Sequence, residues 1–259
     1  ILDARLTMRA GIETLSNMAG MFFSVPQDTG GGDIRVNSML QNLPWWHRST
    51  RDCSDYYDLD PEAIGKFQQV SSLLLGGNGL GLDEALMAGV YYERGDLLNA
   101  VHHAFINFKQ SKDLPYAELR FCGSMTLAMV LYAMGATGDA DKIMAQSAEM
   151  LRKHAPFLLP NFQALKTARS IRAGNADAAK EWLLVYAHRT NNALPFYQIC
   201  RHFTTLRAHI GIGEYAVGVD FGKRLQQLAL DYNRPLDQIE SGILIATALW
   251  RKGEKKGAL

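Results

Sequence analysis

Apolar residues recur three and four positions apart along most of the chain, which is the spacing of one face of an α-helix. The pattern is clear in residues 117–135 (AELRFCGSMTLAMVLYAMG) and continues through residues 140–158 (ADKIMAQSAEMLRKHAPFL). Neither stretch alternates apolar and polar residues as a half-buried strand does. The pattern therefore predicts an all-α protein.

A glycine follows each of five successive apolar stretches, at spacings of 40, 39, 39 and 40 residues: Gly95, Gly135, Gly174, Gly213 and Gly253. A small residue stands five positions after each glycine: Ala100, Ala140, Ala179, Gly218 and Ala258. A bulky residue stands three positions before it: Tyr92, Tyr132, Ile171, Ile210 and Trp250. Glycine ends a helix at low cost in the left-handed conformation, and a small side chain lets a second helix pack closely. The unit predicted is helix, glycine turn, helix.

Prolines recur at the expected joints between these hairpins: Pro115, Pro156, Pro160, Pro195 and Pro235. Hairpins of this length stack on one another, because a single hairpin cannot bury its own apolar face. We therefore expect a right-handed superhelix of about five repeats of 39–40 residues over residues 66–259, with the last repeat truncated. We also expect a longer parent protein, since the sequence starts at Ile1 without methionine and stops at Leu259 inside a hairpin.

Residues 1–65 follow a different pattern and are predicted to form an N-terminal helical cap. A helix is expected over residues 1–21, followed by a glycine-rich loop over residues 27–33 (QDTGGGD). The adjacent Trp45 and Trp46 have two interpretations. They would either plug the open end of the stack or form a surface for a base or a protein partner.

The charge balance argues against several classes of partner. Twenty-seven basic and 26 acidic residues give a net charge of +1, which offers no general attraction to nucleic acid or to an anionic membrane. The strongest apolar run, residues 242–250, is too short for a bilayer-spanning helix, which needs about 20 residues. Cys53, Cys122 and Cys200 are too few and too far apart for a disulfide framework. These features indicate a reducing, cytoplasmic setting.

Motifs for common chemistries are missing from the sequence. We find no phosphate-binding G-x-x-x-x-G-K-[ST], no H-E-x-x-H, no C-x-x-C and no G-x-S-x-G. The nearest metal-ligand pair, Cys200 with His202, lacks a second half. The sequence therefore predicts a protein that is not an enzyme and that needs no cofactor and no metal.

The glycine turn with alanine five residues later resembles tetratricopeptide repeats. In that family the first helix of each hairpin lines the concave wall. The resemblance implies that Asn161, Arg207 and Glu240 are polar groups of a ligand-binding groove. It also implies that three aromatic residues are platforms in this groove: Tyr92, Tyr132 and Trp250. In the alternative interpretation, these aromatics pack between neighbouring repeats.

Four longer stretches resemble the helical sensor region of large MalT-type regulators of the LuxR family: residues 88–104, 159–183, 194–216 and 232–259. The most specific stretch carries I-E-x-x-I-L-x-A-x-A from Ile239 and then K-G-x-x-x-x-A-L from Lys252. The resemblance implies a parent protein with an N-terminal ATPase, this helical sensor and a C-terminal helix-turn-helix. In that family the sensor receives an inducer or an inhibitory partner and controls ATP-linked assembly.

These features lead to one main functional hypothesis and one alternative. The chain is predicted to be the sensing segment of a transcriptional regulator, with a small-molecule inducer or a regulatory protein in its groove. It would contact the ATPase and helix-turn-helix domains of its parent, but neither nucleic acid nor membrane directly. The alternative is a tetratricopeptide-like scaffold that binds a peptide or a second copy of itself. A closed aromatic pocket would favour the small molecule, and an open trough the polypeptide.

Overall fold

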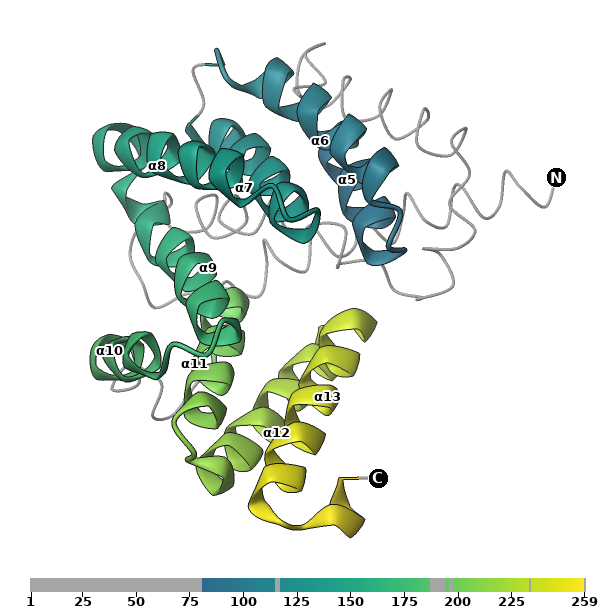
Figure 1. Cartoon of the computed structure of the whole chain (residues 1–259), viewed down its shortest axis with the longest axis vertical. Helices are drawn as coiled ribbons and strands as arrows, with labels where there is room; N and C mark the ends of the chain where they lie inside the picture. The colour runs from purple at the N-terminus through teal and green to yellow at the C-terminus, as the bar shows by residue number, and fades with distance from the viewer. Residues whose placement is uncertain (1–80, 115–116, 187–193, 196–197, 233, 259) are drawn as a thin grey trace, which may run out of the picture. The chain divides into compact units, whose positions relative to one another are not determined.

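The computed structural model describes residues 81–114, 117–186, 194–195, 198–232 and 234–258, and all regular secondary structure in these ranges is helical (Figure 1). None of these helices is both long and apolar enough to cross a membrane. The predicted cap over residues 1–65, with its glycine-rich loop and its two tryptophans, lies outside the described residues. The chain divides into two compact units at Leu159 and Pro160.

The N-terminal unit contains two described hairpins. Helices α5 (Leu82–Glu93) and α6 (Leu97–Ser111) form the first, and α7 (Ala117–Ala133) and α8 (Thr137–His154) form the second. A short 3-10 helix, η2 (Pro156–Leu158), follows α8. Small and branched apolar side chains pack between the helices: Ala88, Ala100, Ala104, Leu127 and Val130. Helix α7 is the most enclosed, since both Phe121 and Met125 are fully buried.

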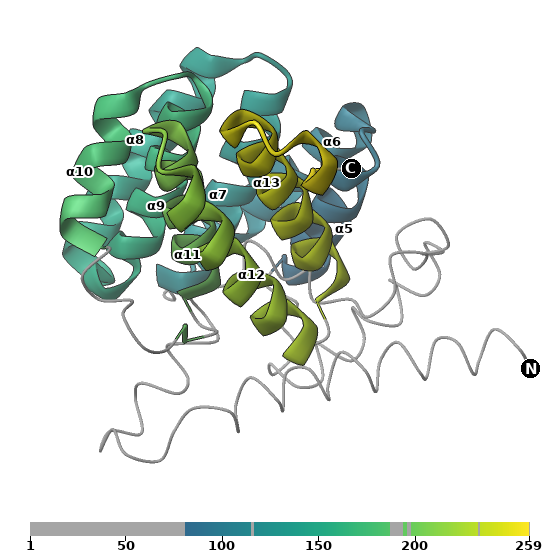
Figure 2. The ribbon, with the colours of Figure 1, turned by 90° about the horizontal axis from the view of Figure 1, so that it is seen from below.

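The C-terminal unit contains two hairpins and one further long helix. Helices α9 (Leu159–Arg172) and α10 (Ala176–Tyr186) precede α11 (Ile199–Gly211) and α12 (Tyr215–Asp231). Helix α13 (Pro235–Lys252) then packs against α12, as Figures 1 and 2 both show, and ends in a 3-10 turn, η5 (Lys255–Gly257). Leu206 and Leu225 are fully buried, and burying a leucine stabilises the fold by about 1.5–3 kcal/mol.

All five predicted glycine turns are confirmed. The glycines have φ between 77° and 93°, which is left-handed backbone. At the first turn the Gly95 N–H donates to the Tyr92 carbonyl at 3.0 Å, and the Asp96 N–H donates to the Tyr91 carbonyl at 2.9 Å. The same two bonds recur after Gly135, Gly174, Gly213 and Gly253, so every hairpin turns through a Schellman motif. No atom lies within 4 Å of where a Cβ would stand on any of the five. Glycine is therefore required by the backbone angle and not by space.

The small residue five positions after each glycine also has the predicted role in the four complete hairpins. Ala100, Ala140 and Ala179 are fully inaccessible to solvent, and Gly218 is buried. A Cβ on Gly218 would lie 3.3 Å from Ile210 Cγ1, so the two helices of that hairpin approach closely. The all-α, tetratricopeptide-like fold is thus confirmed. The predicted right-handed superhelix would run through both units, and it stays a prediction.

Three of the five joint prolines lie where helices begin, whereas Pro195 precedes α11 by four residues and Pro115 lies outside the described residues. Pro156 opens η2, Pro160 stands in the first turn of α9, and Pro235 is the first residue of α13. In a first turn the missing N–H costs nothing, because that group has no partner within the helix. Pro156, Pro195 and Pro235 recur at spacings of 39 and 40 residues, the same period as the glycines inside the hairpins.

Candidate functional site

Polar side chains connect the first helices of successive hairpins in the C-terminal unit. Arg201 Nε on α11 donates to Asn161 Oδ1 on α9 at 2.7 Å. One turn further along α11, the Thr204 hydroxyl lies 3.1 Å from the carbonyl oxygen of Ala164 on α9. Each contact joins residues that are 40 positions apart, which is one repeat. The first helices are therefore held together by hydrogen bonds as well as by apolar packing.

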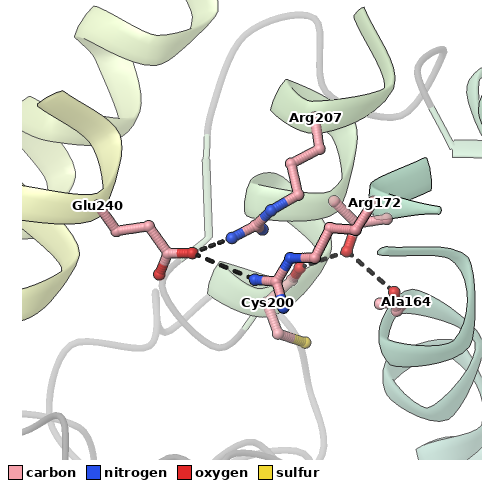
Figure 3. A network of polar contacts seen from close by, with 6 residues as sticks. Ala164, Arg172, Cys200, Arg207 and Glu240 are labelled. Atoms are coloured by element: carbon pink, nitrogen blue, oxygen red, sulfur yellow. Dashed lines mark hydrogen bonds and ion pairs between the residues drawn. The ribbon is translucent and has the colours of Figure 1, made fainter. Parts of the chain in front are cut away.

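A cluster of two arginines and one glutamate extends these contacts to α13. The Arg207 guanidinium on α11 donates to the Glu240 carboxylate on α13. Arg172, at the end of α9, places its Nη2 3.8 Å from the same carboxylate oxygen, Glu240 Oε1. Figure 3 shows the two guanidinium groups reaching Glu240 from different helices. We call Arg172, Arg207 and Glu240 the arginine cluster.

The three side chains of the arginine cluster differ in their exposure to solvent. The exposed fraction of the side chain rises from 11% for Arg207 to 22% for Glu240 and 63% for Arg172. Guanidinium groups stay charged at any physiological pH, so the cluster holds two positive charges and one negative charge. Arg207 also lies over the Phe203 ring, with 5.7 Å between its Cζ and the ring centroid. Its charge is therefore stabilised by a carboxylate and by an aromatic face.

The neighbouring cysteine, Cys200, is a free thiol with a raised pKa. Cys200 lies one turn before Thr204 on α11, and its carbonyl oxygen is 2.9 Å from the Thr204 hydroxyl (Figure 3). Burial raises the pKa of the Cys200 thiol to about 12, so the thiol stays protonated. A protonated thiol is a poor metal ligand and a poor nucleophile.

His202, which the sequence pairs with Cys200, is a buried neutral imidazole. It is inaccessible to solvent, and its Nε2 lies 3.0 Å from the Pro195 carbonyl oxygen, so Nε2 carries the proton and donates. Burial lowers the pKa of His202 to about 4. Its Nδ1 has no hydrogen-bond partner among the described residues. Nowhere among the described residues do three His, Cys, Asp or Glu side chains lie closely enough together to hold a metal ion.

The two candidate tyrosines lie in the N-terminal unit. The Tyr132 hydroxyl donates to Asp141 Oδ1 at 2.6 Å, across the glycine turn that joins α7 to α8. Tyr92 is half-buried and packs on the apolar cluster that includes Ala100 and Leu127. Tyr92 thus packs on a cluster that includes residues of two neighbouring hairpins, whereas the hydrogen bond of Tyr132 stays within its own hairpin.

Trp250 differs from the tyrosines because most of its ring faces solvent. Its exposed fraction is 54%, and Lys255 Nζ lies 5.1 Å from the ring centroid. Ile239 and Ile243, on the same face of α13, are 51% and 60% exposed. The corresponding positions of α11, Ile199 and Phe203, are almost fully buried. Ile239, Ile243 and Trp250 therefore form an exposed apolar strip on α13. The equivalent positions of α11 are buried.

The structure brings together only part of the predicted site. Arg207 and Glu240 are in direct contact, and Asn161 lies on the neighbouring helix, where it is fully buried under Arg201. Tyr92 and Tyr132 belong to the N-terminal unit, and Trp250 lies ten residues beyond Glu240 on α13. Sequence reasoning missed Arg172 and Arg201. Arg201 had a detectable signal, since it follows Asn161 by one repeat, so that a donor and an acceptor recur at the repeat spacing.

Comparison with known protein families agrees with this architecture. The family described as the MalT-like TPR region matches residues 80–259, which include every described hairpin and the whole polar network. No curated protein and no solved structure matches the sequence. The family match covers more than half of the chain and ends at its last residue. The chain belongs to the MalT-like TPR region family.

Proposed function

We propose that the chain is the sensing segment of a MalT-like transcriptional regulator of the LuxR family, and that it works in the cytoplasm without catalysis. A small-molecule inducer or a regulatory protein binds along the first helices of the C-terminal unit. The ATPase and helix-turn-helix domains of the parent protein then carry out the response. Family membership supports the setting, and the polar network supports the location.

One observation carries this proposal. The Glu240 carboxylate is shared by Arg172 and Arg207, so a single contact links α13 to the first helices of the two preceding hairpins. A ligand that engages any of these groups changes how α9, α11 and α13 pack on one another. Because a ligand shifts an equilibrium only through different affinities for two states, such a shared contact is a suitable point of control.

A thermal-shift screen of the whole chain tests the proposal. Sugars, amino acids, nucleotides and aromatic acids are added singly, since a ligand that binds only the folded state raises the melting temperature. We expect at least one reproducible increase that Arg207→Ala weakens. Arg152→Ala is the matched control, because Arg152 is 63% exposed on α8 and pairs only with Glu149 among the described residues. An increase that both variants weaken equally, or none in any class, contradicts small-molecule sensing at this site.

The apolar strip on α13 favours a second candidate function, a scaffold that associates with a polypeptide or with itself. Contiguous exposed apolar residues mark interaction surfaces, whereas singly scattered ones are common on any protein. Sedimentation equilibrium would show a mass that rises with concentration in the native chain but not in Ile243→Asp. Leu98→Asp is the control, since Leu98 is 75% exposed on α6, in the other unit. A monomer at all concentrations counts against self-association.

A further inference from the structure

The first helices α9 and α11 are unusually uniform in charge. Between them they carry five basic residues and no acidic residue: Lys166, Arg169, Arg172, Arg201 and Arg207. By contrast, the second helix α10 mixes acidic and basic groups, with Asp177 and Lys180 forming an exposed ion pair at 3.0 Å. An excess of basic residues attracts anions and raises their local concentration.

Glu240 is the carboxylate of α13 that contacts Arg172 and Arg207. Asp237, about one turn earlier, pairs with Arg234. The Oε1 atom of Glu240 lies between two guanidiniums that come from different repeats. Planar guanidiniums recognise carboxylates through paired charge-assisted hydrogen bonds, in buried sites and ligand sites alike. Two arginines that converge on one carboxylate oxygen thus have the form of a carboxylate-binding site with an internal occupant.

The outer arginine leaves this site accessible to a second anion. Arg172 and Arg207 carry two positive charges against the single carboxylate of Glu240. The outer guanidinium, Arg172, is 63% exposed and 3.8 Å from Glu240, so an incoming anion meets it first. The inner one, Arg207, is 11% exposed, and it therefore interacts in a less polar environment, where charge-assisted bonds are stronger.

We infer that the arginine cluster is a binding site for the carboxylate of a small organic acid, and that Glu240 occupies it as an internal competitor. The ligand carboxylate takes the position of the Glu240 carboxylate against Arg172 and Arg207. Displacement of Glu240 releases the link from α13 to α9 and α11. The inference rests on the proposed function, because it names the ligand class and the moving contact of that same site.

The first measurement follows the arginines directly in the whole native chain. The Nε–Hε signals of Arg172 and Arg207 are assigned by NMR with Arg172→Lys and Arg207→Lys, and sodium malonate is titrated against sodium chloride at equal ionic strength. We expect both signals to shift with one shared half-saturation concentration in malonate and to stay unsaturated in chloride. Equal shifts in both salts would overturn the inference, since they would reflect screening alone.

The second measurement removes the internal competitor. In Glu240→Gln we expect malonate to bind about ten-fold more tightly or better, which is the gain from losing one competing charge-assisted hydrogen bond. Glu254→Gln is the matched control, because Glu254 pairs with Lys252 at 2.7 Å at the exposed end of α13. Unchanged affinity in Glu240→Gln contradicts the competitor role. If that variant does not fold, Glu240→Asp keeps the charge with a shorter reach and should give a smaller gain of the same sign.

Further titrations separate the sources of the anion and the two hypotheses. Phosphate that binds as tightly as malonate overturns the carboxylate class, and so does an acidic peptide that saturates both signals at lower concentration than any small acid. A screening hit without a carboxylate that still depends on Arg207 leaves the proposed function intact and overturns the inference. Saturable malonate binding at Arg172 and Arg207, with no ligand from the screen, supports the inference and counts against the proposed function.

Discussion

The two units use the same hairpin but join their hairpins differently. In the N-terminal unit, α7 presses against α6 so closely that a Cβ on Gly123 would lie 2.1 Å from Ser111 Oγ and 3.2 Å from Phe108 Cα. In the C-terminal unit, the contact between α9 and α11 includes the hydrogen bonds of Arg201 and Thr204. A contact this close around a glycine has one good arrangement, whereas hydrogen bonds can exchange partners with water or ligand. The comparison therefore locates the adjustable joint in the C-terminal unit.

Lowering the pH should destabilise the C-terminal unit more than the N-terminal unit, and this is the largest difference that we expect. The folded state depresses the pKa of His202 from 6.5 to about 4, so its contribution to stability is present above pH 6.5 and is lost as the pH falls towards 4. The full loss corresponds to roughly 3 kcal/mol. Hydrogen exchange between pH 7 and pH 4 should show α11 losing protection before α7. His202→Asn should flatten this pH dependence, and an unchanged profile would show that another group is responsible.

Filling the close contact in the N-terminal unit should have the next largest effect. Gly123→Ala forces α6 and α7 apart, because the buried Ser111 cannot move away freely, and we expect a cost of about 2 kcal/mol in urea unfolding. Ser111→Ala in the same chain should recover part of the loss. Gly138→Ala is the control, since that helical glycine has open space around it and alanine should stabilise it. Equal effects at the two glycines would contradict the close contact.

Breaking the arginine cluster should cost less, about 1–2 kcal/mol for Arg207→Ala, because Glu240 keeps Arg172 and partial access to water. A double-mutant cycle with Glu240→Gln should give a clear coupling energy. The exposed pair Lys142 and Asp139, at 2.9 Å, should give almost none. Coupling as weak as that of the exposed pair would mean that the cluster does not hold α13 in place.

The glycine turns should show the smallest effect and no difference between the units. Gly135→Ala and Gly213→Ala each place a Cβ on left-handed backbone, which costs about 1 kcal/mol. The space around both glycines is open, so the cost should be the same in each unit. Chemical denaturation of the two variants checks this. A clear difference would show that the turns, and not only the joints between hairpins, distinguish the units.

The hairpins could be predicted from sequence because their determinants are local. Gly135 and Ala140 act within a few residues of each other, through a backbone angle and a close helix contact, and the repeat multiplies this signal. The joints between hairpins were harder to predict, because they depend on the rotation of each helix. An error of one residue turns a side chain by about 100°. The sequence predicts Tyr132 as a groove platform but does not predict the bond of its hydroxyl to Asp141 in its own hairpin.

The polar network was half predictable for the same reason. Arg207 and Glu240 were grouped from the repeat register, and the structure joins them. Arg172 stands two residues before Gly174, and no repeat register in the sequence predicts that it contacts α13. Its long side chain places Nη2 3.8 Å from Glu240 Oε1. This distance depends on the Arg172 rotamer and on the packing of α13, which the sequence does not give.

The one-repeat span of the interface contacts has a mechanical consequence. Arg201 bonds to a residue 40 positions back, and Arg207 to one 33 positions ahead, so each joint closes a loop of about one hairpin. When the ends of the C-terminal unit are pulled apart, rupture of one joint frees about 40 residues and no more, or roughly 130 Å of extended chain. Force–extension traces should therefore show separate rupture events, each of which releases the length of about one hairpin.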